Sequence, residues 1–123
     1  MARLIDTSVI IDLERRRHPA ERISVLAAGE PLALASITAN ELLSGVERAD
    51  TLERRQHRLA FVEAVLRIVP VLPFDLQVAR EHARLDAQLR TVGQLIGAND
   101  LLIAATALTH EMSVLTENLR DFE

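Results

Sequence analysis

The order in which short apolar runs and helical patterns alternate constrains the fold of this chain most strongly. Four runs have the length and composition of buried strands: residues 3–5, 31–37, 69–74 and 112–116. Helical patterns separate them, so each strand reaches the next through a crossover connection. Strands that alternate with helices form a parallel sheet with helices packed against its faces. We therefore expect an α/β fold.

Local signals refine this order of elements. The sequence predicts helices over residues 8–17, 38–49, 50–68, 75–92 and 97–111. The run at 69–74 contains two prolines, which predicts a short strand or an edge position. Thr7 or Ser8 is the expected cap of the first helix. Gly93 is the expected end of the helix that starts at Asp75, because glycine readily adopts the left-handed conformation found at helix ends.

Length and composition predict a single domain over residues 1–123. Of these residues 49% are apolar, which is enough to form a core, and no linker or repeat divides the chain. The chain has no cysteine, which excludes disulfides and thiolate metal sites. We see no signal peptide and no apolar run near the roughly 20 residues that span a membrane. We therefore expect a cytoplasmic protein that does not enter a membrane.

The charges exclude some kinds of chemistry. The formal net charge is −4, which argues against a surface built for bulk phosphate binding. All 14 basic residues are arginine. Any mechanism that requires a lysine is therefore excluded.

Polar side chains follow the predicted strands at separated places in the chain. Asp6 comes directly after the first strand, and Glu41 and Asp100 lie in the first turns of two later helices. Asn118 follows the fourth strand. Ligands bind outside the carboxyl ends of the strands in open α/β sheets, so we expect these groups to share one edge. Converging carboxylates repel one another unless a cation such as Mg²⁺ or Mn²⁺ lies between them.

Each of these residues also has an ordinary structural explanation. Asp6 can cap the following helix. Thr38 and Glu41 fit the S/T-x-x-E capping box. Asp100 can interact with the positive end of its helix, and Asn118 is common in turns. Only the joint placement of the residues favours a metal site, and the residues by themselves leave both interpretations open.

Four stretches together resemble a known family. "LIDTSVII", "ITANELLSGV", "IGANDLLIAATAL" and "VLTENLRDFE" are similar, in order and spacing, to the PIN-domain ribonucleases, and most closely to the VapC-type toxins of bacterial toxin–antitoxin pairs. The resemblance implies one PIN domain, a three-layer sandwich whose central parallel sheet is flanked by helices. It also implies an endoribonuclease that cleaves cellular RNA with a water molecule activated by Mg²⁺ or Mn²⁺.

The resemblance assigns roles to individual residues. Asp6, Glu41 and Asp100 match the family's acids, which are both catalytic and metal-binding. Asn118 stands where many PIN nucleases carry a fourth acid, and we include it among the catalytic candidates. Asp121 is a secondary candidate because it lies close to Asn118 in the sequence.

The resemblance also implies pocket hydroxyls and partners. Thr7 and Thr116 match hydroxyl positions that line the family's pocket. The expected partners are an RNA substrate, a cognate VapB-like antitoxin and a second copy of the chain in a homodimer. Arginines in two helical segments can supply positive charge to the RNA: Arg15, Arg16 and Arg17 in the first segment, and Arg48, Arg54, Arg55 and Arg58 in the second. In the family, the second segment also tends to contact the antitoxin. Charge runs of this kind are also typical of a solvated helix face.

Other functions fit the residues less well. A phosphoacceptor receiver domain needs a lysine near its acids, and this chain has none. A phosphatase with an aspartate nucleophile would need a second Asp two residues after Asp6, where Ser8 stands. A catalytically weakened PIN-like scaffold that binds RNA or protein is the main alternative, because Asn118 replaces an acid.

Overall fold

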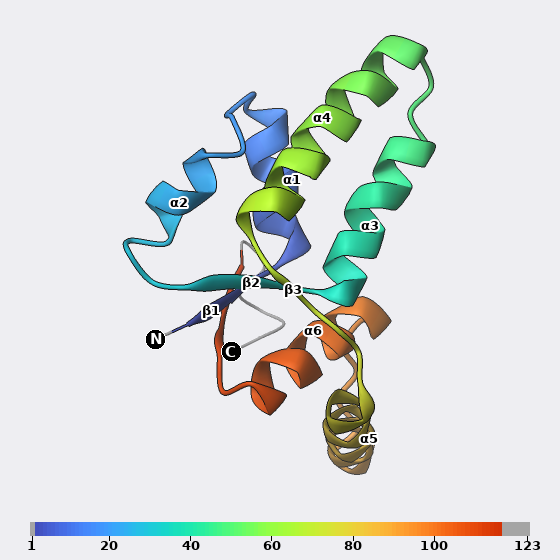
Figure 1. The fold of residues 1–123 in the computed structure, drawn as a ribbon. Coiled ribbons are helices and arrows are strands. Elements are labelled where there is room, and N and C mark those ends of the chain that lie inside the picture. Colours follow the sequence, from blue (N-terminus) through green and yellow to red (C-terminus); the bar gives the residue numbers. More distant parts are fainter. Residues whose placement is uncertain (1, 117–123) are drawn as a thin grey trace.

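A four-stranded parallel sheet forms the centre of the molecule in the computed structural model, which describes residues 2–116 (Figure 1). The strands are β1 (Arg3–Ile5), β2 (Leu32–Ala35), β3 (Val71–Leu72) and β4 (Ser113–Leu115). Their spatial order is β3-β2-β1-β4, and every neighbouring pair is parallel. The chain therefore has the α/β architecture that the alternation of its elements predicts.

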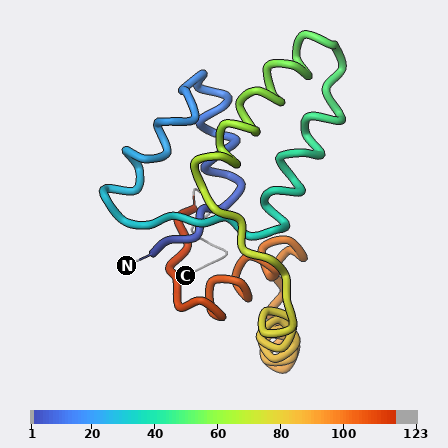
Figure 2. Tube along the Cα trace, in the orientation of Figure 1, coloured from blue at the N-terminus to red at the C-terminus, as the bar shows by residue number. Residues whose placement is uncertain are grey.

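Helices cover both faces of the sheet. The helices on one face are α1 (Thr7–Arg15), α2 (Arg22–Leu26), α3 (Ser36–Glu47) and α4 (Leu52–Ile68). On the other face lie α5 (Leu76–Thr91) and α6 (Ala98–Thr109). The trace in Figure 2 shows the chain passing from the first layer to the second after α4. This is the three-layer sandwich expected from the resemblance.

The two faces of the sheet have cores of different composition. Side chains alternate along a strand, so Ile5 and Leu34 face one layer while Leu4, Ala33 and Ala35 face the other. The first core is rich in large aliphatic side chains: Val9, Ile10, Leu13, Ile23, Leu42, Val46, Val62, Val65 and Val69. The second core contains two alanines of β2 with Ile103 and Ala107 of α6. Small side chains there allow α6 to pack closely against the sheet.

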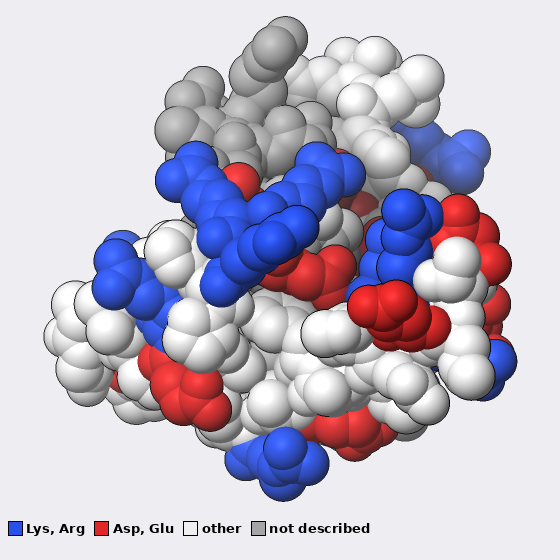
Figure 3. Space-filling model, turned by 90° about the horizontal axis from the view of Figure 1, so that it is seen from above, with Lys and Arg blue, Asp and Glu red and all other residues white. Residues whose placement is uncertain are grey.

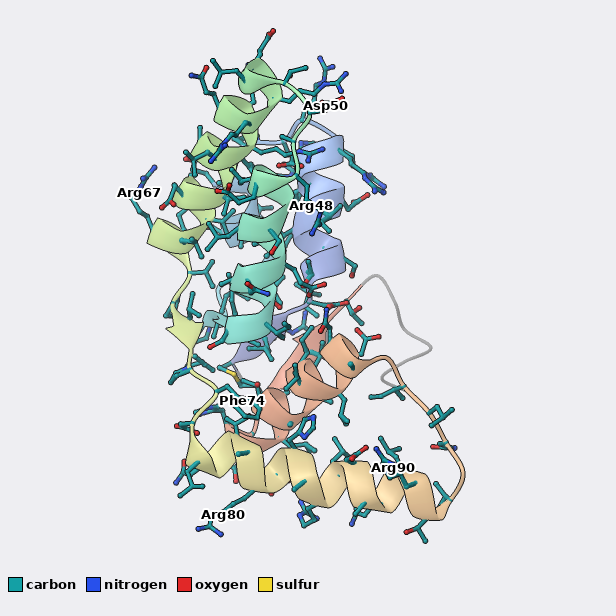
Figure 4. All side chains as sticks on the ribbon, turned by 90° about the vertical axis from the view of Figure 1, so that its right-hand side faces the viewer. Arg48, Asp50, Arg67, Phe74, Arg80 and Arg90 are labelled. Atoms are coloured by element: carbon teal, nitrogen blue, oxygen red, sulfur yellow. The ribbon has the colours of Figure 1, made fainter. Side chains whose placement is uncertain are left out.

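A long antiparallel hairpin of α3 and α4 extends away from the sheet (Figure 4). Asp50 marks its far end, and every residue from 51 to 60 is exposed. The helix α5 lies at the opposite end of the molecule, where Arg80 points away from the other helices (Figure 4). It packs mainly on α6.

The boundaries predicted from the sequence agree with the structure in most places. β3 is a two-residue edge strand, as its prolines predict, and Gly93 ends α5 in the left-handed conformation with φ 71°. The prediction that Thr7 or Ser8 caps α1 is wrong, because α1 begins at Thr7 and Asp6 occupies the cap position. The sequence analysis missed α2, which has five residues, too few for a helical pattern to stand out. No helix within residues 2–116 is long and apolar enough to cross a membrane.

Candidate active site

Asp6 directly follows β1, one of the two inner strands, and is almost fully buried, with 4% of its surface exposed. Its side chain makes no capping hydrogen bond to α1. Instead Oδ2 accepts hydrogen bonds from Thr116 Oγ1 at 2.6 Å and from Ser8 Oγ at 2.8 Å. Burying a carboxylate is costly unless it is paired or hydrogen-bonded, and these hydroxyls offset part of that cost. The structure therefore does not support the explanation of Asp6 as a helix cap.

Glu41 reaches the same region from α3. Its Oε1 accepts a hydrogen bond from Thr7 Oγ1 at 2.8 Å. The α3 helix begins at Ser36, so Thr38 lies within its first turn, and the helix has no side-chain cap. Thr38 is fully buried, and its Oγ1 lies 3.2 Å from Thr7 Oγ1. The capping-box explanation of Thr38 and Glu41 is therefore wrong.

Six side chains at this edge of the sheet form two hydrogen-bonded clusters that meet at the peptide bond between Asp6 and Thr7. We call them together the hydroxyl–carboxylate clusters; one contains Asp6, Ser8 and Thr116, and the other contains Thr7, Thr38 and Glu41. The sequence analysis named four of them as site residues and missed Ser8 and Thr38 in that role. A signal for Thr38 was present, because it precedes Glu41 by three residues and so shares its helix face.

Asp100 occupies the first turn of α6, where the positive end of the helix favours a carboxylate. It is partly buried. Its Oδ2 lies 3.6 Å from the position that a Cβ at Gly97 would take, which is an ordinary van der Waals distance. α6 packs against β1, β4 and α3, the elements that carry or precede residues of the two clusters. Asn118 and Asp121 lie outside the described residues.

The donor atoms near this edge suit a hard divalent cation, because the carboxylates and hydroxyls offer only oxygen. Neither Asp6 nor Glu41 forms an ion pair with a basic side chain in the described part of the chain. However, no three His, Asp or Glu side chains within residues 2–116 are grouped so that they could hold one metal ion. The structure places Asp6 and Glu41 in adjoining clusters, because Asp6 is followed directly by Thr7, which donates to Glu41. The expected convergence of Asp100 with them stays a prediction.

Comparison with known proteins identifies the class of this fold and site. The PIN domain family matches residues 3–123, which is nearly the whole chain. The chain therefore belongs to the PIN-domain family.

Named relatives and a solved structure narrow the similarity. Ribonuclease VapC1 of Rickettsia felis is 38% identical over 123 residues, covering 100% of this chain and 90% of that protein. The tRNA(fMet)-specific endonuclease VapC of Salmonella typhimurium is 32% identical, covering 98% and 89%. The structure of DNA-bound VapBC from Salmonella typhimurium superposes with a TM-score of 0.85 at 30% identity, covering 99% and 90%. Within the PIN-domain family, the chain is thus similar throughout its length to VapC ribonucleases.

Proposed function

We propose that this protein is a metal-dependent endoribonuclease that acts as the toxin of a toxin–antitoxin pair and cleaves cellular RNA. The observation that carries the proposal is the buried Asp6 carboxylate, which has no basic partner in the described residues and is followed in the chain by Thr7, the donor to Glu41. Similarity to VapC ribonucleases supports RNA as the substrate. Similarity to VapBC complexes supports a cognate VapB-like antitoxin as the partner.

In this proposal Asp6, Glu41 and Asp100 hold Mg²⁺ or Mn²⁺ through carboxylate oxygens, the ligands these cations prefer. When bound, such an ion activates water and offsets charge that develops on the phosphodiester. No covalent nucleophile is then needed, which suits a chain without cysteine. Asn118 is the fourth catalytic candidate, and Asp121 is the secondary one.

The chain's own hydroxyls position the acids. Thr116 and Ser8 both donate to Oδ2 of Asp6, which fixes the orientation of that carboxylate. Thr7 donates to Oε1 of Glu41 and thereby links α1 to α3. Geometry of this kind is pre-organised, because the groups do not have to reorient when the substrate binds.

The remaining parts of the proposal concern assembly and location. We propose that the protein forms a homodimer and acts in the cytoplasm, where RNA substrates and an antitoxin are present. A catalytically weakened scaffold is the alternative. It is favoured only by the amide at Asn118 in the position of an acid.

Substitution of the acids tests the proposal directly. Asp6→Asn and Asp100→Asn each remove a charge at almost constant volume, so we expect RNA cleavage and growth arrest to fall at least about 100-fold. Asp86→Asn on α5 is the matched control and should cleave like the wild type, because Asp86 only pairs with the exposed Arg90. Cleavage is measured on total cellular RNA with Mg²⁺ or Mn²⁺, with EDTA as the metal-free arm, and folding is checked by circular dichroism.

Two results would contradict parts of the proposal. Cleavage by Asp100→Asn at the wild-type rate would remove Asp100 from the metal site. A wild-type protein that cuts no RNA with either metal, and that does not arrest growth, would support the scaffold instead.

A further inference from the structure

A groove lies at the end of α1 that is farther from the sheet. It runs between the C-terminal turn of α1 with its following loop and the first half of α4. Six cationic or imidazole side chains line it, and we call it the basic groove: Arg15, Arg17, His18, Arg54, His57 and Arg58. Glu14 and Glu53 are the acids in its lining. Figure 3 looks onto this end of the molecule and shows arginine side chains gathered near the middle of the face.

The arginines of the groove differ in how far protein carboxylates neutralise them. Arg54 forms a two-pronged hydrogen bond with Asp50 at 2.8 and 2.9 Å. Arg58 lies 3.8 Å from Glu14 and donates to the backbone oxygen of Gly45. Arg15 and Arg17 are exposed and form no ion pair with any residue in the 2–116 range. Within residues 2–116, no carboxylate therefore neutralises these two guanidinium groups.

The position of Arg17 runs against local backbone preference. Its φ is 59°, and α1 ends there with hydrogen bonds from Arg17 N–H to the oxygen of Glu14 and from His18 N–H to that of Leu13. Helix ends of this type favour glycine, since a side chain in this conformation costs about 1 kcal/mol. An arginine at this point costs stability and presents a guanidinium to the groove.

We propose that the basic groove binds the sugar–phosphate backbone of the RNA substrate beside the cleavage site, an inference that rests on the proposed function. The nine residues of α1 connect Thr7, next to Asp6, to the groove at Arg15. At 1.5 Å per residue they span about 13 Å, or roughly four nucleotides of a stacked strand. Guanidinium groups bind phosphate oxygens through paired hydrogen bonds.

The composition of the groove favours RNA over a protein segment. An amphipathic peptide helix needs an apolar strip, whereas the described residues that line the groove include two apolar side chains, Pro19 and Phe61, beside the six cationic or imidazole ones. A phosphate backbone needs cations at intervals along a path that starts at the cleavage site. The basic groove provides such cations at the other end of α1.

The test compares two double variants in RNA binding. Arg15→Gln with Arg17→Gly removes both guanidinium charges, and the glycine suits the left-handed backbone, so the fold should be retained. Arg67→Gln with Arg80→Gln removes two charges from α4 and α5 outside the groove and is the matched control. The probe is a fluorescein-labelled single-stranded RNA of about 20 nucleotides, long enough to span the roughly four nucleotides between site and groove. Anisotropy is measured in EDTA over a series of NaCl concentrations.

We expect the groove variant to bind RNA about tenfold more weakly, with the salt dependence of log affinity reduced by about 1.4, and the control to bind like the wild type. With metal present, KM for this RNA should rise while kcat stays unchanged. Cleavage of a trinucleotide, which is too short to reach the groove, should not change.

Other results overturn the inference. Unchanged RNA affinity of the groove variant, with a wild type that binds and cleaves RNA, rejects the groove and leaves the proposed function intact. Loss of affinity for the co-expressed antitoxin with RNA affinity retained would make the occupant a protein. A wild type that neither binds nor cleaves RNA rejects both proposals, and only that result removes the proposed function.

Discussion

At the scale of single residues, Thr7 connects Asp6 and Glu41, the two acids of the site. It follows Asp6 in the chain, and its hydroxyl donates to Glu41 while lying next to that of Thr38. Both threonines are buried, so each hydroxyl depends on a protein partner rather than on bulk water. The chain's acids and its hydroxyls at Thr7 and Thr116 could be selected from sequence motifs. Sequence motifs did not select Ser8 and Thr38, because Ser8 fits a possible helix cap and Thr38 fits a capping box, although Ser8 lies two residues from Asp6 and Thr38 shares a helix face with Glu41.

Replacement of the Thr7 hydroxyl tests this connection. Thr7→Val keeps the shape but removes the donor to Glu41, so we expect cleavage to fall about tenfold and the free energy of unfolding to fall by about 1–2 kcal/mol. Thr7→Ser retains the hydroxyl and should keep most of the activity. Cleavage rates and urea unfolding of the two variants provide the comparison. Equal activity of Thr7→Val and Thr7→Ser would show that Glu41 needs no donor there.

At the scale of helices and strands, the conformation at each helix end explains which helix boundaries could be predicted from the sequence. α1, α5 and α6 all end with a residue in the left-handed conformation, at Arg17, Gly93 and Glu111. Of these three residues, only Gly93 is of a type that favours this conformation, so only the end of α5 could be predicted from it. The predicted ends of the first and last helices therefore run past the observed ones by two residues each, to 17 rather than 15 and to 111 rather than 109.

The start of α4 carries a charge pair with a predictable response to pH. The hydrogen bond and the charge of Arg54 lower the pKa of Asp50 below its ordinary value of 3.8. A carboxyl whose pKa is lowered by folding stabilises the folded state above its unfolded pKa, and this contribution disappears as pH falls through the folded pKa. Asp50 is fully exposed, so the effect is small.

We therefore expect Asp50→Asn to lower Tm slightly at neutral pH and to leave Tm unchanged in strong acid. Thermal unfolding of both proteins from about pH 7 to pH 2 measures this difference. Asp12→Asn, which removes another exposed pair with an arginine four residues away, is a useful comparison. A difference in Tm that persisted below the pKa of Asp50 would have to arise from something other than its charge.

At the scale of the whole molecule, the two cores differ in how well they tolerate larger side chains. The alternation of strands and helices was sufficient to predict the parallel sheet and its layers. The unequal packing of the two faces depends on which side chains meet across the sheet, and periodicity does not determine that. Ala33 and Ala35 of β2 face Ala107 of α6, so this interface has little room for larger groups.

Enlargement of Ala107 tests how tightly α6 packs. Ala107→Leu adds volume at a position that is 4% exposed, and we expect it to lower the free energy of unfolding by about 1–3 kcal/mol. The neighbouring Leu108→Ala is the control, because Leu108 is 51% exposed, and it should change stability by less than about 0.5 kcal/mol. Urea unfolding measures both. No loss of stability in Ala107→Leu would mean that the interface can expand.

The pairing of β1 with β4 also determines when the protein can become active during its synthesis. Thr116 donates to Asp6 across a separation of 110 residues, and β4 is made after all the other strands. Contacts so distant in sequence form late in folding, because the intervening chain must first be closed into a loop. A nascent or prematurely terminated chain that lacks β4 is therefore expected to be inert. A cell that makes this nuclease is then exposed to its activity only after the ribosome has synthesised β4.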